Sequence, residues 1–178
     1  MPKITIDLLS PGSLDAAIRQ IDDYKRSLKS KCESLAERVA ERIAWRASEG
    51  FSTAIADDIF SPAGDRPTGN VSVSVSSEGA LCVVIAEGED AAFIEFGAGV
   101  SYNGPVGSSP NPLVAQEGLP FTIGSHSYVE PTSKTRWWFT KDGQHYGTHG
   151  TPAAMPMYRG VQDAINVIAD LAREVFGR

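Results

Sequence analysis

Basic charge is scarce in this 178-residue chain, which carries 16 lysines and arginines against 22 aspartates and glutamates, a formal net charge of −6. Proteins that bind nucleic acid through its phosphates need a basic surface. The charge balance therefore argues against nucleic acid as the main partner. It suits a protein that must stay soluble before it assembles.

Cysteine and histidine are also few. Cys32 falls on the apolar stripe of an expected helix and Cys82 falls in an apolar strand, so both are interpreted as small buried hydrophobic side chains. His145 and His149 are four residues apart, but a zinc site needs three or four converging ligands, and no cluster supplies the others. We therefore expect no metal and no cofactor.

Long hydrophobic runs are missing as well. No window approaches the ~18 apolar residues of a membrane span. The N-terminal "MPKITIDLLSPGS" lacks the basic start and the apolar centre of a signal peptide. We expect no membrane association, and a protein that is kept in a cytoplasm or built into something assembled there.

Catalytic motifs are equally scarce. The chain contains neither a G-x-S-x-G nucleophile elbow nor a P-loop. The stretch "GAGVSYNG" lacks the third glycine of a dinucleotide fingerprint. We therefore expect no enzyme and no catalytic residue.

The composition that remains is that of an ordinary globular protein, because hydrophobic residues make up 42% of the chain and charged residues 21%. A chain of this size buries roughly 70% of its unfolded surface. We expect a single domain over residues 1–178.

Helical periodicity dominates the N-terminal third, and we expect helix over 13–60. The first segment has Ser13 as a good N-cap and Gly50 as a plausible stop, and a second segment has Phe51, Ile55, Ile59 and Phe60 on one side. A helix of about 36 residues measures roughly 54 Å, whereas a globule of this size is about 40 Å across. The helix therefore either breaks around Ser27–Ser30 or projects, and a projecting apolar stripe needs an oligomer to cover it. The stripe is Leu14, Ile18, Ile21, Leu28, Cys32, Leu35, Val39 and Ile43.

Strands are expected over 70–97. The run "VSVSVS" alternates with a period of two, which predicts a half-buried strand, and "LCVVIAE" is continuously apolar, which predicts a more buried partner. The following "EDAAFIEFGAG" is either a third strand or a helical turn. A long loop over 98–134 is rich in glycine and proline.

The C-terminal part predicts a β-hairpin over 135–147, because Asp142-Gly143 supplies a tight turn between aromatic flanks. A helix is expected over 152–177, packed on the sheet, with Pro152 or Pro156 in its first turn. Since strands follow one another rather than alternate with helices, the predicted fold class is α+β with an antiparallel sheet.

Three short motifs together carry a resemblance to a family. They are Pro67-Thr68-Gly69 leading into strands, the stretch from Phe93 to Gly97, and the Pro152 to Ala164 helix start. Their order, with the "WWF…DG…GT" hairpin between the last two, resembles the tail-component proteins of long-tailed bacteriophages and prophages, which complete the tail or join it to the head. This sequence departs from the family pattern at Ala98, where a threonine is usual, and in the length of its loop.

The resemblance implies a non-enzymatic structural protein of the virion, assembled in the cytoplasm of the bacterial host. Such proteins form rings, often of six subunits, at the neck or the head-proximal end of the tail. The implied partners are further copies of the chain and other neck or tail proteins, namely the connector or stopper, the tail tube and the tail terminator. DNA can pass through the lumen of such a ring without sequence-specific contact.

The corner at Glu95 is the expected subunit interface. On a strand, Glu95 would share a face with Phe93 and need not be buried. It would then cap the N–H groups of the turn at 97–99, or pair with an arginine of a neighbouring subunit such as Arg136 or Arg159. The full set of expected interface residues is Glu95, Phe96, Gly97, Gly99, Tyr102, Arg136, Trp137 and Arg159.

Two other functions remain open from the sequence. A carbohydrate- or small-ligand-binding module would use Trp137 and Trp138 as stacking platforms. A hydrolase would use His126 or His145 with a nearby serine or acid.

Overall fold

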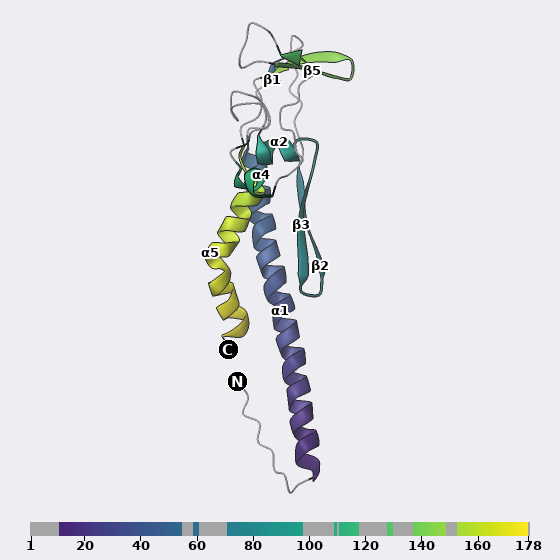
Figure 1. The fold of residues 1–178 in the computed structure, drawn as a ribbon, viewed down its shortest axis with the longest axis vertical. Helices are drawn as coiled ribbons and strands as arrows, with labels where there is room; N and C mark the ends of the chain where they lie inside the picture. The colour runs from purple at the N-terminus through teal and green to yellow at the C-terminus, as the bar shows by residue number, and fades with distance from the viewer. Residues whose placement is uncertain are drawn as a thin grey trace.

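The computed structural model describes residues 11–54, 59–60, 71–97, 109, 111–117, 128–129, 137–148 and 153–177. The molecule is elongated along one helix, α1 (Pro11–Thr53), which is unbroken through Ser27–Ser30 (Figure 1). With 43 residues, α1 measures roughly 65 Å. Of the two alternatives for this helix, projection is therefore the one that holds.

The predicted helical span of 13–60 is too long at its C-terminal end. Ile59–Phe60 form strand β1, which pairs with Gly147 and Thr148. Pairing with a distant strand thus takes these two residues out of the helix that their apolar spacing indicated.

The C-terminal helix, α5 (Pro156–Phe176), runs antiparallel to α1 and packs along its C-terminal half (Figure 1). Two glycines allow the close approach. A Cβ atom on Gly50 would lie 2.7 Å from the Cβ of Pro156, and one on Gly160 would lie 2.9 Å from the carbonyl oxygen of Ile43. Gly50 is therefore not the predicted stop, because α1 continues through it and α5 begins against it.

A β-hairpin packs on the other side of α1 from α5 (Figure 1). Strand β2 (Ser72–Glu78) pairs antiparallel with β3 (Leu81–Glu87), which confirms the two predicted strands. With long helices and an antiparallel hairpin, the fold class is α+β, as predicted.

Strand β3 is the more buried strand of the hairpin, as predicted, since Cys82, Val84 and Ala86 are half-buried whereas β2 has Val73 alone, but its burial is confined to one face. Its alternate residues Leu81, Val83 and Ile85 face away from α1, and Leu81 is 66% exposed. Among the described residues, α1 covers one face of the hairpin and no element covers the other. A continuously apolar strand normally has both faces covered, so the outer face of β3 lacks a cover in this structure.

The buried core sits where the C-terminal end of α1 meets the hairpin and α5. Ala47, Phe51 and Ile94 form its centre, and Val73 and Met157 are among the residues packed around them. Ile94 belongs to a short helix, α2 (Ala91–Phe96), so the last part of the predicted strand region 70–97 is helical. A strand would send neighbouring side chains to opposite faces, whereas this helical turn buries both Ile94 and its neighbour.

A second sheet lies at the end of the molecule beyond α2 (Figure 1). It has the order β1-β6-β5-β4, from β4 (Tyr128–Val129), β5 (Trp137–Lys141) and β6 (Gln144–Thr148). The predicted hairpin over 135–147 is confirmed as β5–β6. Asp142 and Gly143 have φ values of 53° and 77°, the left-handed pair that a tight two-residue turn requires.

The prediction that segment 98–134 is a loop throughout is wrong. Helix α4 (Pro112–Glu117) and strand β4 both lie within it. The Asn-Pro pair that starts α4 combines a favoured N-cap residue with a favoured first helical residue.

Candidate functional site: the Glu95 junction and the uncovered apolar rows

Glu95 joins α2 to the start of α5. The residue is 5% exposed. Its carboxylate accepts backbone N–H groups of Met157 at 2.7 Å and Tyr158 at 3.1 Å, and the side-chain amide of Asn111 at 2.9 Å. The first N–H groups of a helix have no acceptor within the helix. Glu95 therefore caps α5 from 62 residues away in the chain.

The main chain of α2 completes this junction. The N–H groups of Ala154 and Met155 donate to the carbonyl oxygen of Ile94 at 2.9 and 3.4 Å. Pro156 follows and has no N–H to satisfy. Met155 holds a left-handed conformation with φ 56°, which turns the chain into α5. The donors at the start of α5 are thus supplied with acceptors by two consecutive residues of α2.

The electrostatics of the junction combine opposing effects. Burial raises the pKa of Glu95, because the carboxylate loses water. The donors from Met157, Tyr158 and Asn111, and the charge of Arg159, act in the opposite direction. A buried carboxyl group of raised pKa can serve as a general acid in an open site. Here both oxygens are held by structural donors, so the arrangement fixes helices rather than offering a proton.

The structure corrects the predicted role of Glu95. The residue lies on a helix, is buried, and caps α5 of its own chain rather than the turn at 97–99. The correction follows from the helical form of α2, which directs Glu95 toward α5. Arg159, one of the two arginines expected to pair with it from a neighbour, acts on it within the same chain.

The other predicted interface residues divide into two groups. Phe96 is half-buried, and its carbonyl accepts the Ser109 hydroxyl; Gly97, with φ 75°, ends α2 and donates to Phe93 at 2.7 Å. These residues and Arg159 surround the junction.

Trp137 is instead in the second sheet, with Val129 and Thr148 as strand partners. Three predicted residues lie outside the described part of the chain: Gly99, Tyr102 and Arg136.

Sequence reasoning missed Asn111. It is 1% exposed, its side-chain oxygen accepts the Leu113 N–H at 3.0 Å, and its amide group donates to Glu95. One side chain therefore caps α4 and braces the junction. The local signal was the Asn-Pro pair, which predicts a helix start but not the partner across the chain.

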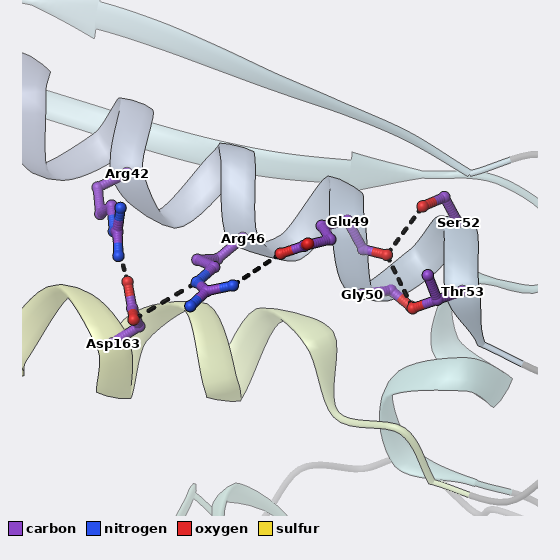
Figure 2. Close-up of polar contacts among 7 residues, drawn as sticks. All are labelled: Arg42, Arg46, Glu49, Gly50, Ser52, Thr53 and Asp163. Atoms are coloured by element: carbon purple, nitrogen blue, oxygen red, sulfur yellow. Dashed lines mark hydrogen bonds and ion pairs between the residues drawn. The ribbon is translucent and has the colours of Figure 1, made fainter.

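Ion pairs join α1 to α5 beside this junction (Figure 2). The carboxylate of Asp163 in α5 accepts a hydrogen bond from Arg42 and lies 3.4 Å from Nε of Arg46. Arg46 also forms an ion pair with Glu49 at 2.7 Å. The hydrogen bond from Arg42 is the main reason why the pKa of Asp163 is lowered. An open groove of about 580 Å³ lies here, lined by Arg46, Glu49, Arg159 and Asp163 among others. Most of its charge is already paired within the protein.

Three rows of large apolar side chains are exposed on the described surface. The first is on the N-terminal half of α1, the second on the outer face of β3, and the third on α5. The members are Leu14, Ile18, Ile21, Tyr24 and Leu28; Leu81, Val83 and Ile85; and Val161, Ile165 and Ile168. Isolated exposed hydrophobic residues are normal, but grouped ones mark interaction surfaces.

Within the described residues, no group of three or more histidine, cysteine, aspartate or glutamate side chains is placed to hold a metal ion. In that same part of the chain, no helix combines the length and the apolar content needed to cross a membrane. Comparisons with protein-family models, curated proteins and solved structures gave no match.

Proposed function

We propose that this protein is a structural subunit that assembles with its own copies into a ring at the head–tail junction, or at the head-proximal end of the tail, of a long-tailed bacteriophage or phage-like particle. The observation that carries the proposal is the set of three uncovered apolar rows. Burying one large aliphatic side chain contributes about 1.5–3 kcal/mol. In a single copy most of these side chains are exposed, so burial of them does not stabilise the protein.

The placement of the rows suits a ring. Cyclic rings use heterologous contacts, in which one surface of a subunit meets a different surface of the next. The β3 row and the α5 row are carried by elements on opposite sides of α1 (Figure 1). Each subunit thus offers two different surfaces, one to each neighbour.

The sequence motifs support the same proposal. Two of the three stretches that resemble phage tail components, Phe93 to Gly97 and Pro152 to Ala164, meet at the junction, where Glu95 caps the N–H groups of Met157 and Tyr158. Their contact gives the two motifs a shared structural purpose. By this proposal the partners are neck and tail proteins, and a ring of six is the expected size.

The proposal is tested by purifying the protein and measuring its mass by light scattering after size exclusion, followed by negative-stain electron microscopy. The expected result is a ring with a central lumen. A protein that stays monomeric at high concentration, and that binds neither tail-tube nor connector proteins, would contradict the proposal.

A further inference from the structure

The N-terminal half of α1 extends beyond the other described elements; we call residues 11–30 the arm (Figure 1). Helix α5 ends beside the start of this segment, where the ammonium group of Lys31 lies 5.9 Å from the centre of the Phe176 ring. The hairpin turn ends at the same level, because Gly79 lies against Glu33. Neither α5 nor the hairpin therefore covers the arm.

The arm continues the same apolar stripe that α5 covers farther along α1. Leu14, Ile18, Ile21 and Leu28 are 57%, 48%, 40% and 40% exposed. With Lys25 between the last two, their spacing alternates between four and three residues, which is the pattern of a helix that pairs with another helix. The stripe therefore fits a helical occupant in the place that α5 leaves free.

Charge along the arm is divided by sign. Its first part, up to residue 23, carries Asp15, Asp22 and Asp23 against one arginine, Arg19. The following residues carry only positive charge: Lys25, Arg26, Lys29 and Lys31. A second copy in the antiparallel orientation, with its two-fold axis near residue 23, places Asp15 of each arm among the basic residues that follow residue 24 in the other, and leaves Asp22 and Asp23 of both copies near the axis. A parallel copy would instead place like charges together and set Lys25 against Lys25.

We propose that the arms of two copies pair as an antiparallel two-stranded coiled coil. In the register that aligns the charges, Leu14 meets Cys32 of the partner subunit, and Ile18 meets the partner's Leu28. Asp15 then lies beside the partner's Lys29, and Ile21 lies opposite the partner's Lys25. Each arm fills the stripe up to the point where α5 of the other copy begins to cover it.

This contact is two-fold symmetric, with the same surface used on both copies. It differs from the heterologous contacts of a ring and does not depend on them. In a ring-forming protein it would join two rings, or hold two subunits together before a ring closes.

Charge reversal tests the pairing. Asp15→Lys with Asp22→Lys leaves Asp23 as the one acidic residue of the arm and makes the arm mostly basic, and Lys25→Glu with Lys29→Glu makes it mostly acidic. In sedimentation equilibrium, each variant alone should lose the arm-paired species, with a dissociation constant at least about tenfold higher than that of the wild type. An equal mixture of the two variants should recover the paired species. Glu37→Lys with Glu41→Lys is the matched control, because it makes the same charge change at two exposed positions of α1 outside the arm.

Cysteine cross-linking tests the orientation, because Cys32 is exposed rather than buried as the sequence predicted. Under mild oxidation, Leu14→Cys should form a disulfide-linked dimer with the native Cys32 of the partner subunit, and Leu14→Cys with Cys32→Ser should not. Peptide mass spectrometry identifies the linked pair. A dimer linked through Cys32 on both chains would mean a parallel pair and would overturn the proposal.

The proposal also fails if neither charge-reversed variant changes the assembly. Rings that persist in both variants, with unchanged mass, would leave the ring function standing and remove the arm contact. Arm-paired dimers without rings would support the arm contact and contradict the ring function.

Discussion

At the residue scale, the carboxylate of Glu95 has no equivalent substitute. Glutamine keeps its size but has one acceptor oxygen, so an NH₂ group would face at least one of the donors from Met157, Tyr158 and Asn111. A buried donor left without an acceptor costs about 1–3 kcal/mol.

Glu95→Gln should therefore lower the free energy of unfolding by about 1–3 kcal/mol, measured by urea titration followed by circular dichroism. Glu87→Gln, at an exposed glutamate of β3, is the matched control and should change it by less than about 0.5 kcal/mol. If the two variants were equally stable, Glu95 would not be holding the junction.

The pH dependence of stability follows from the same residue. Burial raises the pKa of Glu95 above its ordinary 4.5, so the folded protein holds that proton more tightly than the unfolded chain does. The contribution of this proton to the free energy of unfolding is fully present below the unfolded pKa and declines as pH rises through the folded pKa. The advantage of the wild type over Glu95→Gln should therefore shrink as pH rises above 4.5 and passes through the raised folded pKa.

Urea titrations across that pH range check the slope, and an advantage that grew with pH would contradict it. Asp163 acts with the opposite sign: its pKa is lowered, so its contribution is lost only as pH falls through that lowered value. It titrates in both proteins and cancels from the comparison.

At the scale of elements, α1 and α5 approach closely because of Gly160. Gly160→Ala should destabilise the protein by about 1–3 kcal/mol, since the new methyl group would lie 2.9 Å from a backbone oxygen that cannot move aside without parting the helices. Alanine is the better helix former by about 1 kcal/mol, so a loss identifies packing as the cause.

Gly12→Ala is the control for this comparison, because nothing lies within 4 Å of a Cβ at Gly12. Thermal unfolding of both variants should show a fall for Gly160→Ala and no fall for Gly12→Ala. A rise for both would mean that the helix contact tolerates a methyl group.

Elements with a strong period or a defined turn were predictable. The stripe of α1, the alternation of "VSVSVS" and the Asp142-Gly143 turn each depend on neighbours along the chain, and the structure confirms them. The six residues of α2 are too few to display a helical period. The cap by Glu95 depends on a partner 62 residues away, which local pattern cannot reveal. The exposed outer face of β3 could not be predicted, because a sequence shows that a strand is apolar but not what covers each of its faces.

At the scale of the whole molecule, the outer face of β3 is where assembly can be tested apart from folding. Val83→Ser with Ile85→Ser should leave the far-UV circular dichroism unchanged, because these side chains point away from α1. The double variant should reduce assembly to smaller species in light scattering after size exclusion. Ser74→Ala with Ser76→Ala, on the same face, should assemble normally. Unchanged assembly of the first variant would exclude this face from the interface.

The packing of α5 on α1 also has a consequence for synthesis. Contacts such as that between Arg38 and Glu174 join residues 136 positions apart. Translation proceeds at about 5–20 residues per second, so the roughly 100 residues between the two helices take on the order of 5–20 s. During that interval the whole stripe of α1 stands outside the ribosome without its cover. Two chains translated from one messenger RNA can therefore meet through α1 before α5 of either chain has been made.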